Sequence, residues 1–268
     1  MPTAGTGATA QAATDAGLTA TAQAVASGQR VELVNQRTEN MQVFANPSGN
    51  FTAEVSVAPV RVRRAGGWVP VDSTLVEQSN GSVKPRATSL DMTFSGGGSA
   101  PLAALRKGGE GLDISAPFTL PKPTLSGSTA TYAEALPGVD LRVTAGADSY
   151  SELLVVKSRE VAENPKLQVL DFALRGTGLS VRGTSSGGVE ALDAFGNVSI
   201  TGAPPSMWDS AGGAPTSSAG AAVASQSLSV GASEGDALRT VSSSVESSVQ
   251  RLRVDPNFLT DAARVFPL

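Results

Sequence analysis

The chain has 268 residues, of which 40% are hydrophobic and only 4% aromatic, and its formal net charge is -4. It contains no cysteine and no histidine, which excludes a disulfide framework, a Ser-His-Asp triad and metal sites built from these side chains. The slight acidic excess and the lack of a basic stripe give nucleic-acid binding no electrostatic support. No apolar run reaches the roughly 18 residues of a membrane span.

The N-terminal segment is rich in Ala, Thr and Gly. We expect residues 1–13 to form a disordered tail, because they offer too little apolar surface to pack and do not have the pattern of an intact signal peptide. Residues 14–28 have apolar positions at helical spacing and are predicted to form a short helix. The apolar positions of this helix are Leu18, Ala22 and Val25.

From residue 29 to residue 208 the apolar period changes to two, which is typical of half-buried strands. Met41–Ala45 and Phe51–Val57 flank the turn-forming loop at 46–50 and predict a hairpin, and two further hairpins follow it. About fifteen such strands, with turns between them, leave no room for crossover helices. We therefore predict an all-β domain, an antiparallel β-sandwich or pair of sandwiches.

Residues 209–236 interrupt this pattern with Ala, Gly and Ser and contain no basic residue. We expect a flexible insertion there, because these side chains bury little surface. Residues 237–268 are predicted to supply the final strands of the β domain and a helical turn that Asp255 caps. The chain ends in the apolar Val265–Leu268, from which we expect that more protein follows in the native polypeptide.

A glycine-rich loop, Ser95–Ser99, is the one sequence that resembles a phosphate cradle. It follows a predicted strand and precedes Pro101, whereas a phosphate-binding loop opens a helix. A plain turn is the favoured interpretation, and phosphate binding is the alternative.

Paired carboxylates are the catalytic chemistry that remains without histidine, since glycoside hydrolysis needs only two of them across a cleft. The candidates are Glu134, Asp140, Glu152 and Asp193. Each is more simply a solvent-side residue of a strand or a turn cap, so we predict no catalytic residue. No cofactor or metal site is predicted either, although calcium at scattered loop carboxylates stays open.

Aromatic side chains are the groups on which sugars stack. The glycan-stacking candidates are Trp68, Tyr132, Tyr150 and Trp208. Large aromatics are scarce in this chain and its core needs them, so Trp68 is more simply a core anchor. Beside it, the glycine pair at 66–67 turns the chain, and Asp72 is placed to accept backbone N–H groups.

Several phrases occur together in the order known from one kind of protein. The chain resembles the N-terminal region of very large secreted actinobacterial proteins that carry RHS/YD repeats, LamG-like sandwiches or DNRLRE-type modules further along, some of them wall-associated or toxin-like. The resemblance covers roughly residues 17–268. Its phrases are 32–39 (ELVNQRTE), 43–47 (VFANP), 58–62 (APVRV), 67–75 (GWVPVDSTL), 94–98 (FSGGG), Tyr132, 136–141 (LPGVDL), 154–157 (LVVK) and 207–209 (MWD).

The resemblance implies a β-rich fold, export, and a secreted or cell-surface location, although this chain carries no signal peptide. It implies as partners the rest of a larger polypeptide or a β-repeat shell, and it assigns no catalytic residue here. We therefore expect a non-catalytic structural or interaction module. The alternatives are a carbohydrate-binding module for cell-wall or environmental glycans and a glycosidase-like enzyme with two carboxylates.

Overall fold

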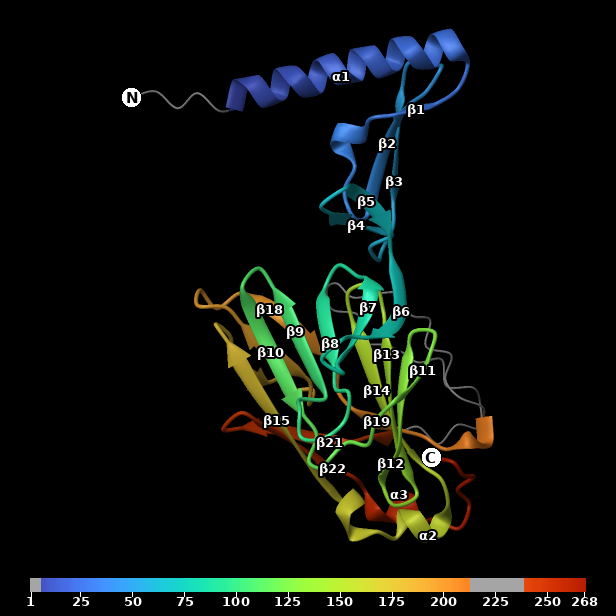
Figure 1. Cartoon of the computed structure of the whole chain (residues 1–268), viewed down its shortest axis with the longest axis vertical. Coiled ribbons are helices and arrows are strands. Elements are labelled where there is room, and N and C mark those ends of the chain that lie inside the picture. Colours follow the sequence, from blue (N-terminus) through green and yellow to red (C-terminus); the bar gives the residue numbers. More distant parts are fainter. Residues whose placement is uncertain (1–5, 213–238) are drawn as a thin grey trace. The chain divides into compact units, whose positions relative to one another are not determined.

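The computed structural model describes residues 6–212 and 239–268, and most of the described chain forms antiparallel strands with few helices (Figure 1). This confirms the all-β class. The chain divides into two compact units, residues 1–71 and 72–268. The single β domain expected from residue 29 onward is thus divided after Val71. The physical reason is that the strands before Val71 pair only with one another, so no sheet crosses the boundary.

The first unit begins with helix α1, Thr6–Ser27. The helix starts at Thr6, whereas we had expected a tail up to residue 13 and a helix from residue 14 on; residues 1–5 lie outside the described part. Four of the eight residues 6–13 are alanine, the residue with the highest helix propensity, so the segment can be helical without an apolar stripe. The helix ends at Gly28, whose N–H donates to the Ala24 carbonyl at 3.0 Å.

Helix α1 packs through its smallest side chains. Ala20 and Ala24 are buried in a cluster with Leu33 and Ala45. Small residues let a helix backbone lie close to a sheet. The sheet is small, so it covers only a narrow stripe of the helix surface. The apolar positions from which the helix is predicted are exposed, and they are Leu18, Ala22 and Val25.

The strands of the first unit form two small sheets. One has the order β1-β2-β3, and the other is the hairpin β4-β5. Both predicted hairpins of this region are confirmed, with Met41 opposite Val55 and Arg63 opposite Trp68. The bounds are β1 Val31–Glu32, β2 Met41–Ala45, β3 Phe51–Val55, β4 Arg61–Arg64 and β5 Gly67–Pro70, with a 3-10 turn at Val34–Gln36.

The larger sheet of the second unit is antiparallel throughout, in the order β21-β22-β15-β10-β9-β8-β7-β6. Strand β15 lies between β10 and β22, so the C-terminal strands complete a sheet that begins near residue 72. The bounds are β6 Asp72–Glu77, β7 Val83–Ala87, β8 Asp91–Phe94, β9 Ala103–Lys107, β10 Glu110–Ser115, β15 Val169–Thr177, β21 Ser242–Glu246 and β22 Val249–Arg253.

Two smaller sheets form the second layer, in the orders β11-β12-β13-β14 and β16-β17-β18, and β19 pairs with β20. Alternation along β13 buries every second residue from Val139 to Ala145, as a strand with one core face must. The bounds are β11 Thr124–Ser126, β12 Thr129–Leu136, β13 Val139–Ala145, β14 Tyr150–Val156, β16 Ser180–Gly183, β17 Val189–Leu192, β18 Val198–Gly202, β19 Ser206–Met207 and β20 Arg239–Thr240.

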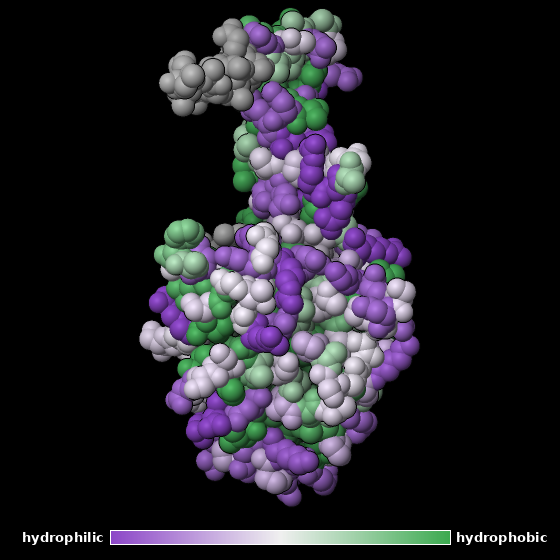
Figure 2. Space-filling view, turned by 60° about the vertical axis from the view of Figure 1, so that its left-hand side comes forward, coloured by the Kyte–Doolittle hydropathy of each residue, from purple (hydrophilic) through white to green (hydrophobic). Residues whose placement is uncertain are grey.

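The core of the second unit lies between these layers. One cluster joins the larger sheet to the four-stranded sheet, and another joins β10 and β15 to β17. Ile114 and Ile200 pack against both clusters, so the two are continuous. On the face seen in Figure 2, hydrophilic and hydrophobic residues are interspersed over this unit. The main core residues are Met92, Phe94, Leu105, Tyr132, Leu141, Val143, Leu170 and Phe172.

Short helices close one end of the second unit: α2 Arg159–Ala162, a 3-10 turn at Pro165–Leu167, and α3 Pro256–Thr260. The Asp255 side chain accepts from the Asn257 N–H at 2.9 Å and caps α3, as expected. Of the predicted insertion 209–236, residues 213–236 lie outside the described part, and residues 210–212 form a 3-10 turn. No described helix is both long and apolar enough to cross a membrane.

One turn of the larger sheet depends on glycine. A Cβ added to Gly96 would lie 1.9 Å from the Gly81 carbonyl oxygen, so the two backbones touch where any other residue would hold them apart. We predict that Gly96→Ala lowers the free energy of unfolding by about 3 kcal/mol, because the obstacle is backbone and has no rotamer to adopt.

Gly202→Ala is the matched control, since its added Cβ would meet Val189 at an ordinary 3.5 Å. We expect it to change the free energy of unfolding by less than about 1 kcal/mol. Chemical denaturation of both variants measures the difference, and equal losses would show that the close approach at Gly96 does not matter.

Candidate functional site

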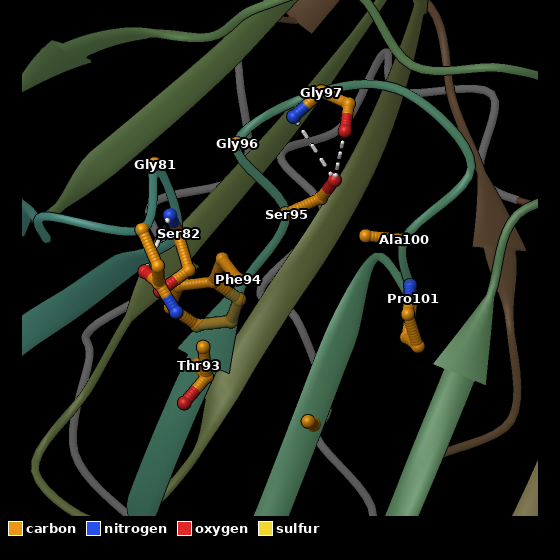
Figure 3. Close-up of a pocket in the computed structure, with 11 residues that line it drawn as sticks. Gly81, Ser82, Thr93, Phe94, Ser95, Gly96, Gly97, Ala100 and Pro101 are labelled. Atoms are coloured by element: carbon orange, nitrogen blue, oxygen red, sulfur yellow. Dashed lines mark hydrogen bonds between the residues drawn. The ribbon is translucent and has the colours of Figure 1, made fainter.

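A hollow of about 320 Å³ lies between the β6–β7 turn and the loop that connects β8 to β9 (Figure 3). It is formed by backbone and small side chains, and among its lining residues only Phe94 is aromatic. It contains no charged side chain that could bind an ionic substrate. The lining residues are Asn80, Gly81, Ser82, Thr93, Phe94, Ser95, Gly96, Gly97, Ala100, Pro101 and Ala104.

In the glycine-rich loop beside this hollow, backbone N–H groups are already hydrogen-bonded within the protein. The Gly97 N–H donates to the Ser95 hydroxyl oxygen at 3.1 Å, and the Gly98 N–H donates to the Leu120 carbonyl at 2.7 Å. A phosphate-binding loop instead directs free N–H groups at its ligand. The hydrogen bonds therefore favour the plain-turn interpretation of this loop over the phosphate cradle.

Tyr132 is fully buried and cannot stack on a sugar, which corrects its place among the glycan-binding candidates. Its hydroxyl donates to the Ser95 carbonyl at 2.7 Å, and burial raises the pKa of the phenol well above its usual range. The residue lies on β12 and reaches the glycine-rich loop across the core. The burial of Tyr132 could have been inferred from the sequence, because it lies two residues after Ala130 on a strand whose alternate residues face the core.

Two of the predicted carboxylates do come together. Lys157 lies between them, with its Nζ 2.5 Å from Glu134 Oε1 and 2.7 Å from Asp140 Oδ1. Asp140 Oδ1 also accepts the Glu134 N–H at 2.9 Å, and Glu134 Oε2 accepts the Gly138 N–H at 2.6 Å. The four residues thus form one network at the β12–β13 turn.

This network holds a strained backbone. Glu134 has φ of 55° and lies in an irregularity of the β12–β13 register between Tyr132 and Leu136. A residue other than glycine costs free energy in this conformation, and the hydrogen bonds of its own N–H and carboxylate offset the cost. Strain often marks active sites, but here the N–H of Glu134 and both of its carboxylate oxygens have partners within the network.

The charges of the network suit an ion pair better than an acid catalyst. The hydrogen bond from Lys157 holds the pKa of Glu134 below its usual range. Burial raises the pKa of Asp140, but the bonds from Lys157 and from the Glu134 N–H outweigh it, so that pKa is lowered as well. A general acid at neutral pH needs a raised pKa. Neither carboxyl meets that requirement.

Glu152 differs from the other predicted carboxylates. It lies opposite Val143 on the edge strand β14, so its side chain projects from the sheet face that forms the core. More than a third of the residue is exposed, yet the apolar surroundings raise the pKa of its carboxyl to about 7. No described residue forms an ion pair with it. An inward-facing charge at a sheet edge is a known guard against edge-to-edge pairing.

Asp193 caps a turn, as its simpler interpretation held. Its Oδ1 accepts the N–H groups of Phe195 and Asn197, both at 2.8 Å, and its Oδ2 accepts from the Asn197 amide at 2.9 Å. These bonds hold the carboxylate and lower its pKa, with the Asn197 side-chain bond contributing most. Asp193 is therefore occupied within the β17–β18 turn.

The remaining aromatic candidates do not form a flat exposed surface. Tyr150 packs edge-on against Phe94 with ring centroids 5.6 Å apart, as part of the core. Trp68 and Trp208 are each partly buried. Trp68 belongs to none of the buried clusters of the described residues; it lies under the Arg63 guanidinium at 5.5 Å, which corrects its assignment as a core anchor.

Sequence reasoning missed Phe195, the most exposed large hydrophobic side chain in the described part of the chain, at 91%. It projects from the tip of the β17–β18 hairpin, in the turn that Asp193 fixes. The available signal was the Asp-Ala-Phe-Gly-Asn sequence at 193–197, because a turn that places an aromatic between a capping aspartate and a glycine exposes it.

Asp209 was also missed, because it was assigned to the flexible insertion. Only 2% of its side chain is exposed, and its Oδ2 lies 3.0 Å from Arg264 Nη1. Arg264 in turn stacks over Phe258 with the guanidinium 4.9 Å from the ring centroid. The ion pair joins the end of β19 to the C-terminal segment, which is a structural role. The two residues are 55 positions apart in the sequence, so no local pattern indicates the pair.

Within the described residues, no group of three or more acidic side chains is arranged to hold a metal ion. The Glu134–Lys157–Asp140 network maintains a bulge, Asp193 maintains a turn, and Glu152 exchanges a proton near neutral pH. The first two arrangements stabilise backbone, and the third places a single proton-exchanging carboxyl at the edge of a sheet.

Asp140→Asn tests the network. We expect it to lower the free energy of unfolding by about 1 kcal/mol at pH 7, because only 14% of the Asp140 side chain is exposed and the charge-assisted bond to Lys157 is lost. A lowered folded-state pKa stabilises above the unfolded-state pKa, so the loss should disappear as pH falls below the ordinary value of 3.8.

The matched control is Asp171→Asn, which removes an ion pair with Arg251 whose side chains are 39% and 44% exposed. Exposed pairs contribute little, so a smaller loss is expected. Urea denaturation across pH measures both variants. An Asp140→Asn loss that persists unchanged at pH 2 would contradict the electrostatic account.

Glu152→Gln should abolish a pH dependence of stability. A carboxyl whose folded-state pKa is raised from 4.5 to about 7 makes the folded state less stable as pH rises through that window. We expect the wild type to lose about 1 kcal/mol between pH 5 and pH 8, a figure reduced for screening because the side chain is partly exposed. Thermal denaturation at several pH values measures it. The same slope in the Gln variant would assign it to another group.

The comparisons with known proteins are negative: no family model, no curated protein and no solved structure matches this chain. Any functional conclusion therefore rests on the residues described above and on the resemblance noted in the sequence.

Proposed function

We propose that this chain is a non-catalytic structural and interaction module of a large secreted or cell-surface bacterial protein of the RHS/YD-repeat kind. It packs against the rest of a larger polypeptide or a β-repeat shell and presents a β-sandwich whose polar groups serve the fold. Export and the RHS/YD context come from the resemblance in the sequence.

The observation that carries the interaction role is Phe195. A phenyl ring that is 91% exposed contributes little to the stability of its own domain. Its turn is fixed by three hydrogen bonds to the Asp193 carboxylate, so little conformational entropy is lost when a partner covers the ring. Aromatic side chains, phenylalanine among them, are enriched at the centres of protein–protein interfaces.

The non-catalytic role is supported by what the reactive-looking groups already do. Tyr132 and Ser95 bond to each other, Glu134 and Asp140 share Lys157, and three amides of the glycine-rich loop, at positions 95, 97 and 98, are occupied. A nucleophile or general base needs a group that is free to meet its substrate. Each of these groups would have to break a bond of the fold first.

One observation favours each alternative. The partly exposed Trp68 and Trp208 could contact sugars, which would make the chain a carbohydrate-binding module. The raised pKa of Glu152 resembles that of a glycosidase general acid. A second carboxylate about 5–10 Å away would be needed, and Glu134 and Asp140 are both engaged with Lys157.

A single panel of glycans distinguishes the three functions. We expect no release of reducing ends from cell-wall and environmental polysaccharides, and no change in tryptophan fluorescence when they are added. The fluorescence readout is sensitive because the chain contains only two tryptophans.

Turnover that disappears in Glu152→Gln would replace the proposed function with the glycosidase. Fluorescence quenching that disappears in Trp68→Ala or in Trp208→Ala would replace it with the carbohydrate-binding module. Glu163→Gln, a change at an exposed residue outside every cluster described above, serves as the control for both readouts.

A further inference from the structure

Strand β3 has one edge that no strand of the described residues pairs with. It pairs with β2 and forms the edge of its sheet. The flanking bonds, Asn46 N–H to the Asn50 carbonyl and Ser56 N–H to the Asn40 carbonyl, set the phase of the ladder. By the alternation of antiparallel pairing, Thr52 and Glu54 direct their backbone groups to β2. The backbone groups of Phe51, Ala53 and Val55 therefore point outward from the edge.

The same three residues present an apolar face. They lie opposite Ala45, Val43 and Met41, on the face of the sheet that contacts α1. All three are exposed, Phe51 at 52% and Val55 at 72%. Figure 2 shows hydrophobic residues at the surface of this unit as well. The edge thus combines unpaired backbone groups with uncovered apolar side chains.

Edge strands of this length are usually guarded. Natural proteins use an inward-facing charge, a lysine, a proline or a very short strand for this purpose. Strand β14 carries Glu152 on its core face, and β1 has only two residues. Strand β3 has five residues, with no lysine or proline. Its one charge, Glu54, lies on the other face and is paired with Arg30 at 2.5 Å.

We propose that β3 is a self-association strand, through which two copies of this chain pair antiparallel about a two-fold axis at Ala53. In this register Phe51 lies opposite Val55 of the second copy, and Ala53 lies opposite its own counterpart. Glu54 lies opposite Thr52, so no like charges meet. The sequence Phe-Thr-Ala-Glu-Val is therefore complementary to itself, which a two-fold interface requires.

The register also satisfies the backbone. The three outward residues of each copy form three hydrogen-bonded pairs, and each such pair exchanges two N–H to C=O bonds. The two three-stranded sheets become one continuous sheet with a common apolar face. The interface is a single short strand pair, so we expect a dimer that dissociates at micromolar concentration. The inference deepens the proposed interaction role and rests on it.

Charge substitutions at Ala53 test the axis. Ala53→Lys places two ammonium groups opposite each other in the dimer, and Ala53→Glu does the same with carboxylates. We expect the wild-type chain to show a concentration-dependent dimer in sedimentation equilibrium and each variant to remain monomeric over the same range. An equimolar mixture of the two variants should recover the dimer, because unlike charges then face each other. Recovery also shows that both variants are folded.

Ala173→Lys is the matched control, since Ala173 is an exposed alanine in β15 with strands paired on both sides. It should dimerise like the wild type. A wild-type chain that stays monomeric, or variants that dimerise separately as well as the wild type does, would overturn the proposal. Neither result bears on glycan turnover, so failure here is distinguishable from failure of the non-catalytic role.

Discussion

The glycine-rich loop of the second unit depends on one buried polar contact between the layers, the hydrogen bond from the Tyr132 hydroxyl to the Ser95 carbonyl at 2.7 Å. Both groups are buried, so an unpaired carbonyl there would cost the full desolvation of the group. The bond joins a strand of the four-stranded sheet to the glycine-rich loop of the larger sheet. In a chain with few aromatics, the largest fully buried side chain thus also fixes the relative position of the two layers.

The loop that receives this bond can lie in the core only because it has little side chain of its own. Gly96 contacts the Gly81 carbonyl directly, and Gly98 exchanges two backbone bonds with Leu120. The Ser95 hydroxyl turns back to its own loop at Gly97. The glycine run resembles a ligand-binding loop in sequence. In this fold it contacts three other segments, the β6–β7 turn, the backbone at Leu120 and strand β12.

Elements governed by local periodicity could be predicted, and those set by distant pairing could not. The alternation at 41–57 and the turn residues between identified the first hairpin, and Asp255 with Pro256 identified α3. The orientation of α1 could not be predicted from its larger apolar residues, because the side chains that contact the sheet are the small ones. Similarly, the Asp209–Arg264 pair and the position of Lys157 between two carboxylates arise only when the strands are assembled.

The residue types gave different amounts of information about the site. The absence of histidine and cysteine from the sequence is enough by itself to limit the chemistry that the chain can perform. The roles of the carboxylates were not readable, because Glu134, Asp140, Glu152 and Asp193 differ only in their neighbours. Lys157 lowers the pKa of Glu134 and the bonds of its turn lower that of Asp193, whereas the apolar sheet face raises the pKa of Glu152. Phe195 escaped notice because exposure of a phenylalanine is a property of the finished turn.

The edge position of Glu152 has a consequence for how the molecule responds to its surroundings. A chain without histidine has no side chain of ordinary pKa between about 5 and 8. Burial raises the carboxyl pKa of Glu152 into that interval. As pH rises through it, Glu152 gains a negative charge at the edge of its sheet, so the guard against edge-to-edge pairing is stronger in neutral than in mildly acidic surroundings.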